Sequence, residues 1–110
     1  MTTSNGKPAL LVVDDDPLIT DTLAFALGTD FEVLACDSRP NAVELLRQLP
    51  EAPRLALVDL GLPPSPHTPD EGFALIADLL AHAPRMKIFV LCGQNDAANA
   101  RHARALGAFE

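Results

Sequence analysis

The chain of 110 residues is long enough for one domain with a single hydrophobic core and too short for two. Hydrophobic residues make up 48% of it, which favours a folded globule over a disordered segment. Its 15 acidic side chains outnumber 8 basic ones, and the net charge of −7 argues against direct binding to nucleic acid or to an anionic membrane surface.

The first residues of the chain are polar. The opening MTTSNGKP lacks the apolar core of a signal peptide, and no apolar run approaches the roughly 18 residues of a membrane-spanning helix. We therefore expect a cytoplasmic protein with a flexible tail at residues 1–7 and one domain at residues 8–110.

The first apolar run, ALLVV (9–13), is short and rich in branched residues, which is typical of a central parallel strand covered on both faces. Asp16 and Pro17 behind it are typical of a helix start, because Asp caps free N–H groups and Pro fits the first turn. We expect this helix to end at Gly28. Its expected inward-facing residues are Ile19, Leu23, Ala26 and Leu27.

Two further strands and a helix follow. FEVLAC (31–36) predicts the second strand, and Ser38 is the expected cap of a second helix that Pro50 stops. LALVDL (55–60) predicts the third strand, with one charged residue, Asp59, near its C-terminal end. The expected inward-facing residues of the second helix are Ala42, Leu45, Leu46 and Leu49.

The second half begins with a long loop, GLPPSPHTPDEG, which four prolines stiffen. A third helix is expected to end before Pro84, and KIFVLC (87–92) predicts a fourth strand. Residues 96–106 predict a fourth helix with Gly107 after it, and the final AFE is typical of the start of a fifth strand. The expected inward-facing residues of the third helix are Phe73, Ile76, Ala77 and Leu80.

The regular alternation of strands and helices predicts an α/β fold with a doubly wound parallel sheet and right-handed crossovers. Open sheets of this kind bind ligands beyond the carboxyl ends of their strands. The acidic residues and one thiol that follow these ends are therefore expected on one rim. They are Asp14, Asp15, Asp16, Asp59 and Cys92.

Clustered carboxylates at strand ends have three explanations: they cap a helix, share protons at raised pKa values, or bind a hard cation. Capping accounts for Asp16 but not for Asp14 and Asp15, and Asp59 comes from a different strand. Converging carboxylates repel one another, and a divalent ion such as Mg²⁺ removes that cost. A carboxylate placed like Asp59 can also act as a nucleophile on phosphorus. An aspartyl phosphate, a structural cation and simple solvated acids remain alternatives on spacing alone.

The remaining reactive side chains form no motif. Cys36 and Cys92 lie far apart in strand-like runs, and we expect two buried, reduced thiols. His67, His82 and His102 lack metal-ligand spacing and are expected on the surface.

The stretches LLVVDDDPLI, LALVDLGLP and IFVLCG, in this order, resemble the receiver domain of bacterial two-component response regulators. The resemblance covers about residues 8–110 and implies a flavodoxin-like sheet with strand order 2-1-3-4-5. It also implies that Asp59 is the phosphoacceptor. Asp14 and Asp15 would form the acidic pair around Mg²⁺, with Asp59 and the backbone carbonyl of Gly61 as its other protein ligands.

The same resemblance implies a function. The phosphoryl group would come from a sensor histidine kinase, and phosphorylation would switch an output, with transcription regulation the expected kind. The pattern VDLGLPPSP…EG is similar to receivers fused to ATPase-type transcription activators. We expect no enzyme activity beyond self-catalysed phosphotransfer and dephosphorylation. An aspartyl phosphatase would need a Thr motif where Pro17 and Leu18 stand.

Three features depart from the family pattern. Cys92 stands where the family has Thr or Ser, and the loop between Pro63 and Gly72 is longer than usual and borders the site. The Lys of the fifth strand does not appear before Glu110, so we expect a receiver that lacks most of its fifth strand and helix. These departures support an alternative, a degenerate receiver that acts as a non-phosphorylated protein-interaction module. The flank of the sheet that the missing fifth strand and helix would leave uncovered also predicts self-association.

Overall fold

The computed structural model describes residues 6–91 and 97–108. Every predicted helix and strand of these residues is present, and the strand ends lie within one residue of the predicted ones. The position of Cys92 and the predicted start of a fifth strand at residues 109 and 110 lie outside the described residues. The elements are β1 (Ala9–Val13), α1 (Pro17–Leu27), β2 (Glu32–Cys36), α2 (Arg39–Gln48), β3 (Leu55–Asp59), α3 (Asp70–His82), β4 (Lys87–Leu91) and α4 (Ala97–Leu106).

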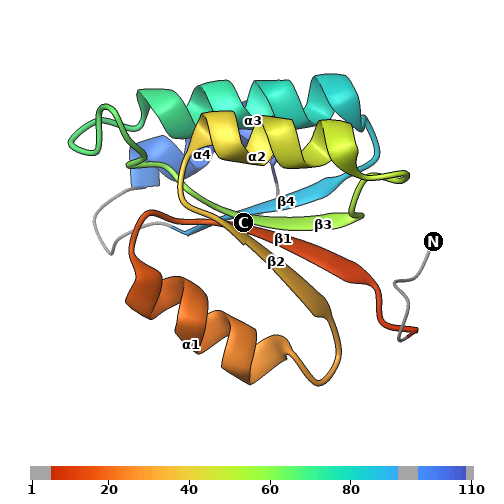
Figure 1. The fold of residues 1–110 in the computed structure, drawn as a ribbon. Coiled ribbons are helices and arrows are strands. Elements are labelled where there is room, and N and C mark those ends of the chain that lie inside the picture. Colours follow the sequence, from red (N-terminus) through yellow and green to blue (C-terminus); the bar gives the residue numbers. More distant parts are fainter. Residues whose placement is uncertain (1–5, 92–96, 109–110) are drawn as a thin grey trace.

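The four strands form one parallel sheet in the order β2-β1-β3-β4, as the doubly wound topology predicts. Val13 of β1 pairs with Cys36 on one side and with Val58 on the other, so the carboxyl ends of three strands meet at one edge. Helices α2, α3 and α4 cover one face of the sheet, and α1 lies on the opposite face (Figure 1).

The main core lies between the sheet and helices α2 to α4. Branched residues of β1, β3 and β4 point into it, and each fully buried side chain of this size stabilises the fold by about 1.5–3 kcal/mol. The largest fully buried side chains on this side are Leu11, Val13, Val58, Leu62, Leu75, Ile76, Leu79 and Ile88.

The predicted inward face of α3 was partly wrong. Ile76 is buried as expected, but Ala77 is exposed, and Phe73 and Leu80 are only half-buried. Helix α3 packs against α2 and α4 as well as the sheet, so its buried arc is centred elsewhere than the pattern suggested. The buried residues of α3 are Gly72, Leu75, Ile76 and Leu79.

Helix α1 has no fully buried residue. Its start is as predicted, because Asp16 Oδ1 accepts a hydrogen bond from the Leu18 N–H at 3.0 Å. Its inward face is only partly confirmed: Leu23 and Leu27 are half-buried, whereas Ile19 and Ala26 are exposed. Among residues 17–27 none is fully buried, since the described elements offer α1 only the sheet to pack on.

Two large apolar side chains of α1 face solvent. Leu18 is 71% exposed and Phe25 is 91% exposed. Gly28, which follows α1, has φ −67° and is not in the left-handed conformation that often ends helices. Gly107 after α4 does adopt it, with φ +114°, and the Ala108 N–H then donates to the Ala103 carbonyl at 2.9 Å.

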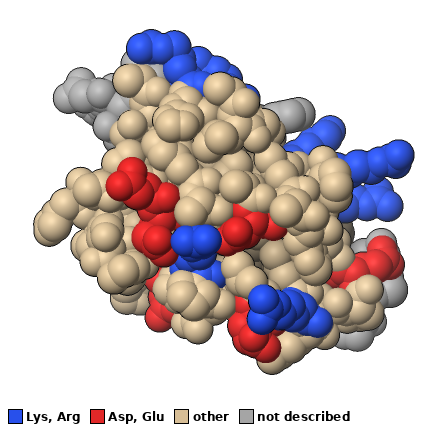
Figure 2. Space-filling view, turned by 90° about the horizontal axis from the view of Figure 1, so that it is seen from above, with Lys and Arg blue, Asp and Glu red and all other residues tan. Residues whose placement is uncertain are grey.

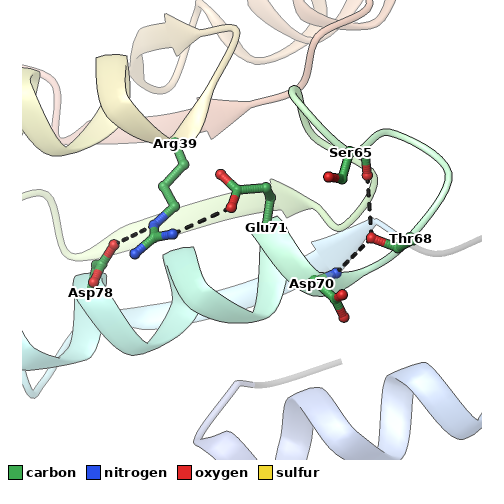
Figure 3. A network of polar contacts seen from close by, with 6 residues as sticks. All are labelled: Arg39, Ser65, Thr68, Asp70, Glu71 and Asp78. Carbon is green, nitrogen blue, oxygen red and sulfur yellow. Dashed lines mark hydrogen bonds and ion pairs between the residues drawn. The ribbon is translucent and has the colours of Figure 1, made fainter.

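Helices α2 and α3 are joined by a charged network. Arg39 Nε donates to Asp78 Oδ2 at 2.7 Å, and Arg39 Nη1 donates to Glu71 Oε2 at 3.3 Å (Figure 3). Acidic and basic side chains are interspersed on this helical face (Figure 2). No helix in the described part of the chain has the length and apolar character needed to cross a membrane.

Candidate metal centre

The three consecutive acids after β1 have different surroundings. Asp14 is only 7% exposed, and one of its carboxylate oxygens accepts the N–H of Asp16 at 2.9 Å. Asp15 is exposed. Asp16 is the cap of α1, which leaves Asp14 and Asp15 for another role, as the sequence predicted.

Asp59 reaches the same rim from β3. Strands β1 and β3 are neighbours, and Val13 of β1 pairs with Val58 of β3. The residues that follow these two, Asp14 and Asp59, therefore lie side by side. Carboxylate oxygens of Asp14, Asp15 and Asp59 lie within 4.8 Å of one another. The predicted convergence of these three side chains is therefore confirmed.

The electrostatics of the cluster favour a bound cation. Burial raises the pKa of Asp59 to about 6, and the charge of Asp14 adds to this, against the opposing N–H bond from Gly61 at 3.3 Å. Burial is also the main cause that raises the pKa of Asp14. Both carboxylates are thus costly to ionise, and three acidic oxygen donors suit Mg²⁺ or Ca²⁺. The residues fit a hard divalent cation.

The long loop between β3 and α3 folds back beside Asp59. A Cβ atom added at Gly61 would lie 2.6 Å from the carbonyl oxygen of Pro66, so this oxygen sits directly over the Gly61 backbone. Thr68 Oγ1 donates to the Ser65 carbonyl and accepts from the Asp70 N–H, each at 3.4 Å (Figure 3). The loop borders the site, as the sequence predicted.

Gly72, which the sequence predicted only as the end of this loop, is buried in the structure. It lies within α3, which begins at Asp70, because Asp70 and Glu71 suit the positive end of a helix. A Cβ atom at Gly72 would lie 2.3 Å from the Cα of Leu60, and the Gly72 N–H donates to the Leu60 carbonyl at 3.1 Å. The only signal in the sequence was a glycine in a helical first turn, where glycine is otherwise unfavourable.

The remaining predicted residues lie as follows. Cys36 is half-buried and free, and burial raises the pKa of its thiol. The three histidines are exposed as expected, and the His102 ring stacks on Phe73 with ring centroids 4.1 Å apart. A ligand role for the Gly61 carbonyl stays a prediction.

Comparison with known proteins finds one matching protein family. The family model described as "Response regulator receiver domain" matches residues 10–110. No curated protein matches the chain.

Several solved structures have folds similar to that of this chain. One is a response regulator protein from Burkholderia pseudomallei with a phosphorylated aspartic acid, a calcium ion and citrate, at 31% identity and TM-score 0.78, over 93% of this chain and 56% of that one. NtrX from Brucella abortus in complex with ADP is 26% identical with TM-score 0.81, over 94% of this chain and 22% of that one. A receiver domain protein from Clostridium thermocellum is 26% identical with TM-score 0.81, over 94% of this chain and 79% of that one. The chain thus spans little more than half of the first protein and about a fifth of the second.

Proposed function

The chain belongs to the response regulator receiver domain family, and we propose that it accepts a phosphoryl group on Asp59 from a sensor histidine kinase in two-component signal transduction. The observation that carries this proposal is the convergence of Asp14, Asp15 and Asp59 within 4.8 Å at the rim of the sheet. The phosphorylated aspartic acid of the Burkholderia protein supports it. In the transfer, the bond between phosphorus and the histidine nitrogen breaks as a bond to an Asp59 oxygen forms.

Each residue of the rim has a part in this proposal. The Gly61 N–H donates to one oxygen of Asp59, which orients the carboxylate for attack on phosphorus. Asp14, Asp15, Asp59 and the Gly61 carbonyl would hold Mg²⁺, which when bound neutralises charge on the transferring group. Asp15 would be the more direct ligand of the acidic pair, since it is exposed and no backbone N–H is bonded to it in the described residues.

Phosphorylation of Asp59 is tested with a small phosphodonor. We expect the wild-type protein with Mg²⁺ to gain one phosphoryl group by intact-mass spectrometry and Asp59→Asn to gain none. Asp15→Asn should label about tenfold more slowly or worse, because charge on the transferring group is less well neutralised. Asp21→Asn, which removes an exposed carboxylate of α1, is the matched control and should label like wild type.

Equal labelling of wild type and Asp59→Asn would refute the assignment. If beryllofluoride with Mg²⁺ changes neither the NMR spectrum nor the melting temperature, the alternative of a non-phosphorylated protein-interaction module is favoured.

The proposal extends to the output. We infer that the chain has no catalytic turnover beyond its own phosphotransfer and dephosphorylation, and that it acts in the cytoplasm. The similarity to NtrX, solved in complex with ADP, supports an ATPase-type transcription activator as the protein that this receiver controls.

We also propose that this 110-residue chain self-associates through the exposed face of α1. Leu18 and Phe25 present large apolar surfaces to water, and a second copy would cover them. We expect the mass from light scattering to rise with concentration. The double variant Leu18→Glu and Phe25→Glu should stay monomeric, whereas Ala81→Glu on α3 should behave like wild type. A concentration-independent monomer mass for the wild-type protein would contradict this.

A further inference from the structure

A small hollow lies next to Asp59, on the side of β4 and α4. Its volume is about 270 Å³, far above the roughly 15 Å³ that one water molecule needs by the same measure, so it has room for a phosphoryl group. Its wall includes Asp59, Gly61, His67, Thr68, Leu91 and Asn99. Two of these, His67 and Thr68, belong to the long loop between β3 and α3.

The polar side chains of this wall differ in what they can offer a ligand. The Thr68 hydroxyl is already used within the loop, since it donates to the Ser65 carbonyl and accepts from the Asp70 N–H. The imidazole of His67 is exposed and makes no hydrogen bond or ion pair within the described part of the chain. His67 is therefore a free N–H donor from the loop toward the hollow.

The loop is held in this place by its own backbone. The Pro66 carbonyl lies over Gly61, and the Ser65 N–H donates to the Leu62 carbonyl at 3.0 Å. The Thr68 N–H in turn donates to the Ser65 carbonyl at 3.1 Å. His67 thus directly follows the residue that packs on Gly61, so a contact by its imidazole costs mainly side-chain rotamer entropy and little backbone entropy.

The negative charge of the site favours a hydrogen-bond donor beside the phosphoryl group. A phosphoryl group on Asp59 would add about 1.5–2 negative charges close to Asp14 and Asp15. Among the described residues, no Lys or Arg lines the hollow.

We propose that His67 donates a hydrogen bond from its imidazole to an oxygen of the phosphoryl group on Asp59, so that the long loop forms one wall of the phosphate site. This role rests on the phosphorylation of Asp59 proposed above. It assigns a ligand contact to a loop residue that the sequence marks only as part of a long connection.

The contact is tested by titrating beryllofluoride, a phosphoryl analogue, in the presence of Mg²⁺ and following the NMR spectrum. We expect His67→Ala to bind beryllofluoride at least about 10-fold more weakly than wild type, as fits the loss of one hydrogen bond to a charged group. His67→Gln keeps an N–H donor and should recover part of the affinity. His82→Ala, at an exposed histidine near the far end of α3, is the matched control and should bind like wild type.

The outcomes separate this proposal from the function on which it rests. A wild-type protein that does not respond to beryllofluoride overturns both. A responding wild type with unchanged affinity in His67→Ala overturns the His67 contact alone. Melting temperatures of the unliganded variants are measured in parallel. If His67→Ala and His67→Gln lose affinity equally and both have lowered melting temperatures, His67 has a structural role instead. That result also overturns the His67 contact.

Discussion

Replacing Asp59 with Asn is expected to raise the melting temperature of the metal-free protein near pH 8, and to raise it less as the pH falls. In the folded protein the pKa of Asp59 is raised to about 6 from an ordinary value of 3.8, first by burial and then by the charge of Asp14. The ionised carboxylate therefore destabilises the fold above about pH 6. That destabilisation is lost as the pH drops through the folded pKa, because the folded protein takes up the proton first.

The size of this effect can be bounded. The shift of about two pKa units corresponds to about 3 kcal/mol if taken at full value, and partial exposure of the carboxylate reduces this to about 1–2 kcal/mol. The expected gain of Asp59→Asn is then about 5 °C or more near pH 8 in the presence of a chelator, and close to zero near pH 4. Differential scanning calorimetry across this range measures it.

Two comparisons make the experiment decisive. Asp21→Asn removes an exposed carboxylate from α1 and should show no comparable gain at any pH. Adding Mg²⁺ should stabilise wild type but not Asp59→Asn. The difference between their melting temperatures should therefore become smaller. A gain that is the same at all pH values would contradict the raised pKa of Asp59.

Gly72→Ala is expected to destabilise the domain by about 2 kcal/mol or more. Alanine is favoured over glycine in a helix by about 1 kcal/mol, so propensity alone predicts a gain. The added Cβ, however, would lie 2.3 Å from the Cα and 2.8 Å from the carbonyl oxygen of Leu60, and backbone atoms cannot rotate away as a side chain can. Forcing α3 away from the end of β3 outweighs the propensity gain.

The position of Gly72 gives this variant a second readout. Leu60 directly follows Asp59, so a displaced α3 should also weaken Mg²⁺ or beryllofluoride binding at the rim. Ala77→Gly, at an exposed position of the same helix, measures propensity without steric overlap and should cost only about 1 kcal/mol. If Gly72→Ala unfolds at the same urea concentration as wild type or at a higher one, the close contact between Gly72 and the Leu60 backbone is contradicted.

The elements of this fold follow closely from local sequence patterns. The run at residues 9–13 is continuous and branched, and Asp16 with Pro17 specifies the start of α1 through the chemistry of one cap. The buried faces were harder to predict. Ala77 and Leu75 both fit a helical period, and their burial depends on which neighbours α3 meets, which local spacing does not encode.

The acidic site was predictable because parallel strands carry their C-terminal residues to one edge of the sheet. The convergence of Asp14 with Asp59 required only the order of the strands. The close backbone packing of Gly61 on Pro66 and of Gly72 on Leu60 was not predictable. It depends on contacts of a few ångström between backbone segments, and no periodicity marks these in the sequence.

The acidic turn after β1 carries residues of the candidate metal site and also the cap of α1. Asp14 accepts the N–H of Asp16, and Asp16 in turn caps α1, a helix with no fully buried side chain among its residues. Local opening of α1 is therefore expected to cost little free energy, and it would disturb the backbone that positions Asp14 and Asp15. We therefore expect cation affinity and the docking of α1 to be thermodynamically linked: a partner that covers this helix should tighten cation binding by Asp14 and Asp15, and a bound cation should protect the helix from opening.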